Sequence, residues 1–243
     1  QERTGAPVYL SEAARKTAIR TWGEGERYSD GLVAAFREHG LPPDLAEAIH
    51  RNLLGFRQRV SPQPAETQEL KAGEEFRMAG VRWETIGGEG HAPGHVSFYD
   101  RNRKKLICGD QVLPDISPNI GWMPDGDPDP LGSYLESLRP LLEFEVETAY
   151  PGHRDPFGRF RERVGQLLDH HERRLDKIAD LIGTETVTSF DVCERLFGAH
   201  LRGNPHNLRF ALAETIAHLV LLEKRGKLKR VGRADEMILF AKS

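Results

Sequence analysis

The pattern of hydrophobic and polar residues changes along this 243-residue chain. In the first 60 residues apolar positions recur every three or four residues, which is typical of amphipathic helices. Ser11 and Asp30 are suitable N-caps, and Gly40 and the Pro-rich stretch from Ser61 are suitable ends. We therefore predict one short strand and three helices, over Pro7–Leu10, Glu12–Trp22, Asp30–Gly40 and Pro43–Arg59.

From residue 74 the period falls to two, which indicates strands. Four strands are predicted, over Glu74–Met78, Val81–Ile86, Val96–Tyr99 and Lys105–Cys108. Residues 111–130 lack either period and are rich in Pro, Asp and Asn, so we expect a long loop at the rim of a site. A helix, a short strand and a loop should follow, over Leu131–Glu143, Val146–Tyr150 and Pro151–Gly158.

The last 85 residues form a separate pattern of helices followed by a hairpin. The expected helices cover Arg159–Ile182, Thr188 or Ser189 to about Leu201, and Asn207–Lys224. The expected strands, Leu228–Val231 and Met237–Ala241, flank the turn at Gly232–Glu236. This order is typical of a winged helix, so we predict two domains, residues 1–158 and 159–243.

Composition narrows the class of protein. The chain is 38% hydrophobic and 29% charged, has no run near 18 apolar residues, and begins with polar residues. These features predict a globular cytoplasmic protein without a membrane span or signal peptide. Its two cysteines, Cys108 and Cys193, lie in apolar runs and offer neither a disulfide framework nor a cysteine zinc site. Any bound metal must be held by other residues.

Charge is unevenly distributed. The net charge of −3 argues against a strongly basic nucleic-acid binder. Residues 158–243 nevertheless carry 16 basic and 12 acidic residues. A basic cluster near the predicted hairpin could contact phosphates, and consists of Lys224, Arg225, Lys227, Lys229, Arg230 and Arg233. Nucleic-acid binding is therefore possible but not favoured, because acidic residues interleave the cluster and no aromatic platform accompanies it.

Three short motifs carry the candidate chemistry, and each lies at the end of a predicted strand. They are Gly90-His91-Ala92-Pro93-Gly94-His95, then Gly109-Asp110, then Tyr150-Pro151-Gly152-His153. Imidazole and carboxylate groups are common ligands of catalytic zinc, and neighbouring glycines let the backbone turn sharply. Each motif means little alone, but their order and positions point to a shared site.

Together the motifs resemble the C-terminal part of the catalytic domain of the metallo-β-lactamase superfamily, followed by its winged-helix domain. The resemblance implies an α/β fold, an αββα sandwich. It implies that His91 and His153 each bind one of two zinc ions and that Asp110 bridges both as metal ligand and catalytic residue. His95 would support a ligand without binding metal. The substrate-binding residues stay unknown.

One family signature is absent. The sequence His-x-His-x-Asp-His, which supplies the other ligands in the family, does not occur in this chain. Residues 1–10 resemble the stretch that normally follows it. We therefore expect a missing N-terminal segment of about 80 residues, estimated from ordinary strand and loop lengths, as the partner that completes the sandwich and the site.

The resemblance implies a binuclear-metal hydrolase that uses a metal-bound hydroxide on a small acyl substrate, a thioester, ester or lactone. No Gly-x-Ser-x-Gly nucleophile motif competes with this interpretation. Two alternatives remain, a metal-dependent endoribonuclease with a winged-helix RNA-binding domain and a metal-free interaction module. Apolar residues of the second and third helices could line an acyl pocket or simply pack together, namely Leu41, Leu45, Leu53, Leu54 and Phe56.

Overall fold

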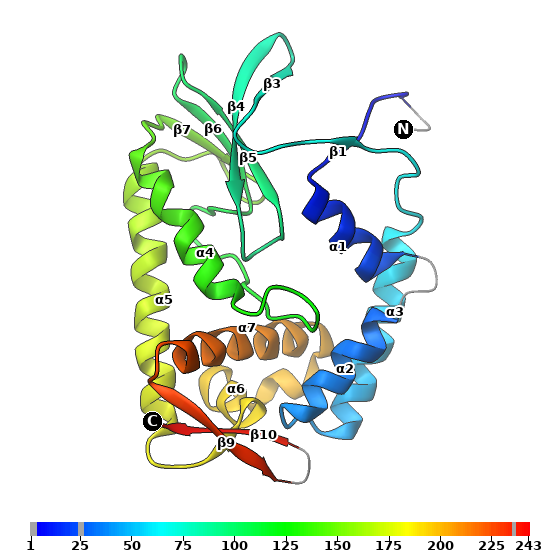
Figure 1. The fold of residues 1–243 in the computed structure, drawn as a ribbon, viewed down its shortest axis with the longest axis vertical. Coiled ribbons are helices and arrows are strands. Elements are labelled where there is room, and N and C mark those ends of the chain that lie inside the picture. The colour runs from blue at the N-terminus through cyan, green and yellow to red at the C-terminus, as the bar shows by residue number, and fades with distance from the viewer. Residues whose placement is uncertain (1–3, 24–26, 235–236) are drawn as a thin grey trace. The chain divides into compact units, whose positions relative to one another are not determined.

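The computed structural model describes residues 4–23, 27–234 and 237–243 (Figure 1). The chain forms two compact units. The first unit contains the chain up to Ile19, Pro62–Pro118 and Gly132–His170. The second unit contains Arg20–Ser61, Asn119–Leu131 and His171–Ser243. Each unit is built from segments that are distant in sequence.

A five-stranded sheet forms the framework of the first unit (Figure 1). Its strands are β3 (Glu75–Met78), β4 (Val81–Gly88), β5 (His95–Asp100), β6 (Lys105–Gly109) and β7 (Thr148–Pro151). They lie in the order β3-β4-β5-β6-β7, antiparallel except for the parallel pair β6–β7. The strands expected from the period of two are confirmed. Two short strands, β1 (Tyr9–Leu10) and β2 (Gln68–Glu69), form a separate parallel pair. The sequence predicted β1 but not β2, because residues 68–69 have no strand pattern.

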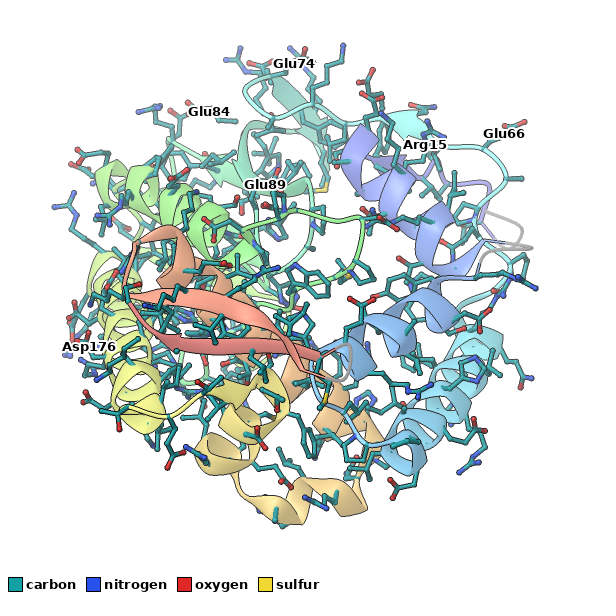
Figure 2. The ribbon with its side chains drawn as sticks, turned by 60° about the horizontal axis from the view of Figure 1, so that its bottom comes forward. Arg15, Glu66, Glu74, Glu84, Glu89 and Asp176 are labelled. Atoms are coloured by element: carbon teal, nitrogen blue, oxygen red, sulfur yellow. The ribbon has the colours of Figure 1, made fainter. Side chains whose placement is uncertain are left out.

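The two faces of this sheet differ in burial. One face carries Tyr99, Leu106 and Cys108, all at most 2% exposed. Successive side chains of a strand point to opposite faces, so Trp83 and Ile107 lie on the other face. Both are half-buried. Glu74 and Glu84 lie on the outside of the ribbon near the sheet (Figure 2). The first unit therefore has one packed sheet face and one partly covered face.

Three helical segments belong wholly or partly to the first unit, α1 (Glu12–Trp22), α4 (Pro130–Leu138) with the 3₁₀ helix η1 (Arg139–Glu143), and α5 (Phe160–Ile182). The helix expected to reach Glu143 changes to 3₁₀ geometry because Pro140 cannot continue an α-helix. The predicted loop at residues 111–118 is held by one arginine. Arg163 donates from Nε to the Leu113 carbonyl at 2.6 Å and from Nη2 to the Ile116 carbonyl at 2.9 Å.

The second unit packs four helices with a small sheet. The helices are α2 (Tyr28–Glu38), α3 (Pro43–Val60), α6 (Ser189–Phe197) and α7 (Pro205–Lys224), with the 3₁₀ helix η2 (Ala199–Gly203). The strands are β8 (Val187–Thr188), β9 (Leu228–Ala234) and β10 (Met237–Lys242), in the order β8-β10-β9. The expected succession of helices and hairpin is confirmed, although part of the predicted turn, residues 235–236, lies outside the described residues.

Two predicted helix ends in this unit were wrong. Asp30 does not cap α2, which begins at Tyr28; its carboxylate lies 2.9 Å from Nε2 of His50 instead. The helix expected to reach Leu201 ends at Phe197, because Gly198 adopts a φ of +93° that other residues rarely tolerate. At the start of α6 the expected cap is present, since Thr188 and Asp191 form a reciprocal capping box.

The core of the second unit explains the apolar residues of α2, α3 and the turn between them. Leu41, Leu45 and Leu53 are buried in one cluster with residues of α6 and α7, such as Phe190 and Leu212. This arrangement favours helix packing over an acyl pocket for these three leucines, whereas Leu54 is 43% exposed. The boundary after residue 158 stays a prediction. No helix within the described ranges is long and apolar enough to cross a membrane.

Candidate metal centre

The candidate ligands meet because three strands end at the same edge of the sheet. Strands β4, β6 and β7 run in the same direction, since β5 is antiparallel to both β4 and β6 and β7 is parallel to β6. Asp110 directly follows β6, and His153 follows β7 by two residues. The turn between β4 and β5 carries His91 at the same edge. Sheet topology thus brings together three segments that are separated in sequence.

The two histidines approach the same carboxylate oxygen. Nε2 of His91 lies 3.6 Å from Oδ2 of Asp110, and Nε2 of His153 lies 3.5 Å from it. Both distances are long for a hydrogen bond. Two ligand atoms bound to one tetrahedral zinc ion at about 2.05 Å lie about 3.3 Å from each other. The two observed His–Asp distances are close to this spacing. His91 and Asp110 are about one-quarter exposed, and His153 is 69% exposed.

The other carboxylate oxygen of Asp110 is confined. Oδ1 is buried and has no hydrogen-bond partner among the described residues. A Cβ atom at Gly152 would lie 2.4 Å from this oxygen. Glycine at position 152 therefore leaves the room that the carboxylate occupies. An oxygen atom that is buried without a donor is costly, and a cation would compensate it.

His95 lies against the turn that carries Asp110. Its Nε2 would be 2.6 Å from a Cβ atom at Gly109, which has a φ of +51°. Its Nδ1 is buried, and the described residues supply it no hydrogen-bond partner. Burial, and to a smaller extent the charge of His91, lower the pKa of His95 to about 4, although Asp110 opposes the shift. His95 is therefore a neutral ring packed behind the turn.

A hydrogen-bond network that the sequence did not reveal fixes this turn to α4. The Tyr134 hydroxyl donates to the Gln111 carbonyl at 3.0 Å, and Nε2 of Gln111 donates to Oγ of Ser137 at 2.8 Å. Ser137 donates in turn to the Tyr134 carbonyl at 2.8 Å. Gln111 is 1% exposed, so these bonds are shielded from water. A glutamine beside a candidate ligand was the only signal available in the sequence.

A second network holds the turn that carries His91. Ser11 caps α1 by accepting from the Ala14 amide, and its hydroxyl donates to the Gly94 carbonyl at 2.6 Å. The Gly94 amide donates to Oε2 of Glu89 at 3.1 Å. Gly94 has a φ of +69°, and a Cβ atom there would lie 2.4 Å from the Ser11 hydroxyl. A helix cap thus also positions the candidate ligand loop.

The arrangement provides only part of a metal site. Within residues 4–23, 27–234 and 237–243, no group of three or more His, Cys, Asp or Glu side chains could by itself hold a metal ion. His91 and His153 instead form two pairs with the same carboxylate. The donor atoms, their spacing and the confined Asp110 oxygen fit a metal ion, but further ligands would have to complete its coordination.

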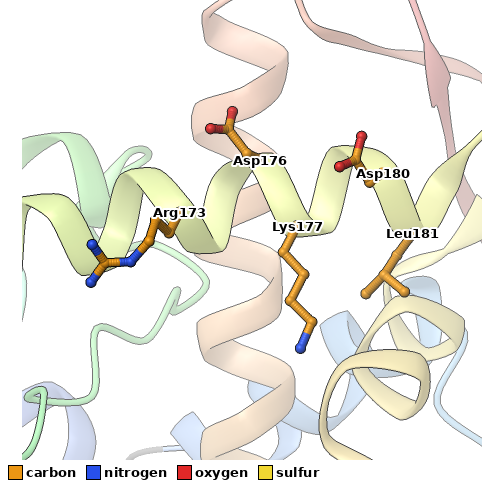
Figure 3. Close-up of a pocket in the computed structure, with 5 residues that line it drawn as sticks. All are labelled: Arg173, Asp176, Lys177, Asp180 and Leu181. Atoms are coloured by element: carbon orange, nitrogen blue, oxygen red, sulfur yellow. The ribbon is translucent and has the colours of Figure 1, made fainter.

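Two further features among the described residues, a hollow on α5 and the two cysteines, offer less chemistry. A hollow of about 460 Å³ on α5 is lined by Arg173, Asp176, Lys177, Asp180 and Leu181. Asp176 and Asp180 point to one side of the helix, while Lys177 and Leu181 point to the other (Figure 3). These side chains do not converge on one point. The two cysteines are also unsuited to nucleophilic chemistry, because burial raises the pKa of both Cys108 and Cys193 to about 12.

The edge of the mixed sheet therefore brings His91, Asp110 and His153 together. Residues 1–153 match the Metallo-beta-lactamase superfamily, and residues 175–243 match the Metallo-beta-lactamase-like, C-terminal domain. The chain belongs to the metallo-β-lactamase superfamily. This confirms the family predicted from the three motifs and its α/β fold.

Two solved structures are similar over nearly the whole chain. A metallo-beta-lactamase family protein from Thermus thermophilus is 31% identical, with a TM-score of 0.86 over 100% of this chain and 73% of that one. A beta-lactamase domain protein from Burkholderia ambifaria is 26% identical, with a TM-score of 0.84 over 98% of this chain and 67% of that one.

Curated relatives include hydrolases of different kinds. The probable metallo-hydrolase YqjP of Bacillus subtilis is 27% identical over 76% of this chain and 58% of its own length. An atrochrysone carboxyl ACP thioesterase of Emericella nidulans is 27% identical over 55% of this chain and 38% of its own length. A hydroxyacylglutathione hydrolase of Synechococcus is 34% identical over 33% of this chain and 31% of its own length. The chain thus spans between one-third and three-fifths of these relatives, and their common character is hydrolysis.

Proposed function

We propose that the protein is a metal-dependent hydrolase of small acyl substrates, with zinc as the metal. The approach of His91 and His153 to Oδ2 of Asp110 carries this proposal. His91 and His153 would each hold one ion through Nε2, and Asp110 would contact both through its carboxylate. When bound there, a metal ion would act as a Lewis acid and would lower the pKa of a coordinated water molecule.

The chain's own residues keep these donors in position. Gln111 and Tyr134 fix the turn after β6, so that the Asp110 carboxylate points to the sheet edge. Ser11 fixes the turn that carries His91. The ring of His95 fills the space behind Gly109. Preorganised donors of this kind avoid reorganisation during the reaction.

The relatives support a thioester as the substrate class. One is named an atrochrysone carboxyl ACP thioesterase, and another a hydroxyacylglutathione hydrolase. We therefore propose thioesters first, followed by esters and lactones.

The proposal does not extend to RNA. In the predicted basic cluster, most side chains have carboxylate partners. Lys224 lies 2.7 Å from Asp129, Arg225 lies 2.7 Å from Glu172, and Lys227 and Arg230 have similar partners. Paired charges attract phosphate less than free ones. The helices and hairpin of the second unit, which we interpret as a winged-helix module, would therefore serve packing before RNA binding.

We also propose that further strands complete the sheet sandwich and the ligand set. The half-buried face of the sheet carries a hollow of about 460 Å³ lined by Val81, Trp83, Ile107 and Tyr150, among others. Each Å² of apolar surface that is covered contributes about 25 cal/mol. A second sheet on this face would bury these side chains, as the αββα architecture requires.

Variants of the four site residues test the proposed function. Asp110→Ala should lose both metal ions and activity, because this one carboxylate would hold both ions. His91→Ala and His153→Ala should each weaken mainly one site. His95→Ala should keep most of the metal, with about 10- to 100-fold weaker binding at most.

Metal content by mass spectrometry and turnover of a thioester panel would be measured on all four purified variants. If His95→Ala empties the site while His91→Ala retains two metals, the ligand assignment is wrong. If none of the four changes the metal content, the hydrolase proposal fails.

A further inference from the structure

The turn that carries His153 is exposed to solvent, although it supplies a candidate ligand. Residues 152–156 are all exposed, and the His153 side chain is 69% exposed. Two backbone hydrogen bonds between Ala149 and Phe157, at 2.8 and 3.0 Å, close the base of the turn. Burial therefore does little to hold the His153 ring, and polar contacts of the turn have to keep it near Asp110.

The residue after His153 has an unusual backbone conformation. Arg154 has a φ of +76°, in the left-handed region that residues other than glycine, asparagine and aspartate rarely adopt. Strain of this kind persists only where the surrounding structure holds it, and it gathers at functional sites. Because the strained residue directly follows a candidate ligand, its contacts bear on the position of that ligand.

An ion pair joins Arg154 to the loop that follows β6. Nε of Arg154 lies 3.4 Å from Oδ1 of Asp115. Arg163 of α5 holds the backbone on both sides of Asp115, because it donates to the carbonyls of Leu113 and Ile116. The carboxylate of Asp115 is thus presented to Arg154 by a fixed segment of the loop.

The same two segments are also joined through the backbone. The Gly152 amide donates to the Gly109 carbonyl at 3.0 Å, one residue before each of the candidate ligands. The ion pair of Arg154 lies beyond the ligand in both segments. His153 and Asp110 are therefore held between two links, one made by the backbone and one by side chains.

We propose that Arg154 is a positioning residue, which together with Asp115 holds the turn so that Nε2 of His153 stays close to Asp110. This inference rests on the proposed function, because it concerns how His153 approaches its metal ion. Arg154 acts only through His153 and has no need to touch metal or substrate. An ion pair between exposed side chains changes an equilibrium by a factor of about 5 at most, so its effect should fall on one ligand rather than on the whole fold.

Arg154→Asn separates the ion pair from the backbone strain. Asparagine tolerates the left-handed conformation, but its side chain is too short to keep the contact with Asp115. The melting temperature of the metal-free protein should therefore stay the same or rise. Zinc should bind about 5-fold more weakly at one of two sites, and Asp115→Asn should have the same effect. The double variant should bind no more weakly than either single variant, because both changes remove the same pair.

The imidazole signals of His153 in nuclear magnetic resonance spectra give a readout that needs no metal. They are assigned by their loss in His153→Ala. In the metal-free wild type they should differ from those of a free histidine, and in Arg154→Asn they should move towards them. If wild type binds no zinc, the proposed function fails, and these signals alone decide whether Arg154 positions the ring.

Lys104→Asn is the matched control. Lys104 also has a positive φ, +49°, and its Nζ lies 3.0 Å from Oε2 of Glu145. It immediately precedes β6, whereas Asp110 immediately follows that strand. Lys104→Asn therefore removes a similar ion pair at the opposite edge of the sheet, and zinc affinity and the His153 signals should stay as in wild type.

Three results would overturn the proposal. The first is an Arg154→Asn variant with the zinc affinity and the His153 signals of wild type. The second is a lower melting temperature together with weaker zinc binding in Arg154→Asn but not in Asp115→Asn, because Arg154 would then stabilise the turn without the pair. The third is a higher KM for a thioester at unchanged zinc affinity, which would make Arg154 a substrate contact. If Arg154→Asn does not fold, Asp115→Asn carries the same test.

Discussion

Two glycines shape the candidate metal centre as much as the candidate ligands do. Gly152 and Gly109 leave the space that Asp110 and His95 occupy. The sequence predicted the three polar residues that meet, because motif order and strand ends can be recognised along a chain. It did not predict Gln111, Ser137 or Ser11 as their supports, because those contacts form between segments that only the folded chain brings together.

Gly152→Ala should weaken metal binding about 10- to 100-fold, the usual effect of disturbing a group that orients a ligand. The backbone at Gly152 needs no left-handed conformation, so the new methyl group should displace the Asp110 carboxylate rather than unfold the chain. Titration with zinc, together with the melting temperature, measures both effects.

The matched control is Gly165→Ala in α5, where a Cβ atom would meet nothing within 4 Å. Alanine there should stabilise the helix by up to about 1 kcal/mol and leave zinc binding unchanged. Zinc affinity in Gly152→Ala equal to that of wild type would show that the Asp110 carboxylate need not occupy the observed position.

At the scale of elements, the sequence predicted most helices and strands but not all of their ends. The 3.6-residue period predicted the observed bounds of α1. Pro43, a residue that favours the first position of a helix, predicted the observed start of α3. The start of α2 was wrongly predicted from Asp30, because a residue that often caps a helix can also lie within its first turn. There its negative charge stabilises the helix by interacting with the helix dipole. The pairing of β1 with β2 depends on tertiary contacts and could not be predicted from two-residue strands.

The junction between α2 and α6 should make stability depend on pH. His39 ends α2, is 3% exposed, and its Nδ1 lies 2.7 Å from Oγ of Ser189. Burial, and to a smaller extent the charge of Arg230, lower the pKa of His39 to about 4. The unfolded chain therefore binds a proton below its ordinary pKa of about 6.5, while the folded chain does not. Stability from this residue is complete above pH 6.5 and is lost as the pH falls towards 4.

Urea unfolding between pH 4.5 and 7.5 measures this effect. As the pH falls from 7.5 to 4.5, the free energy of unfolding should decrease in both proteins. The decrease should be larger in wild type than in His39→Gln, by up to about 3 kcal/mol. Other buried histidines contribute equally to both proteins and cancel in the comparison. Parallel curves for the two proteins would mean that His39 is not held neutral.

At the scale of the whole molecule, chain order and spatial units do not coincide. The core of the second unit joins α2 and α3, near the start of the chain, to α6 and α7, near its end. Hydrophobic periodicity identifies which residues of a helix are buried, but not which distant helix covers them. For this reason the sequence predicted that these four amphipathic helices exist, with two of their ends misplaced, and left their partners open.

Deletion of Thr184–Ser243 should therefore damage more than the C-terminal elements. It would expose Leu32, Phe36 and Ile49, which are at most 2% exposed in the intact chain. We expect a truncated protein that aggregates or binds a hydrophobic dye, as measured by size-exclusion chromatography and fluorescence. Removal of the exposed residues Lys242 and Ser243 alone is the control and should have little effect. A monomeric truncated protein with sharp thermal unfolding would contradict this account.

The parallel pairing of β6 with β7 has a consequence for the order in which the site is assembled. Neighbouring strands from β3 to β6 are joined by short turns, so their pairing closes small loops quickly. Lys105 in β6 meets Thr148 in β7, which requires the chain to close a loop of about 40 residues. Contacts of such high sequence separation slow folding. His153 should therefore reach Asp110 late, so that a nascent chain exposes the carboxylate before the second histidine can shield it.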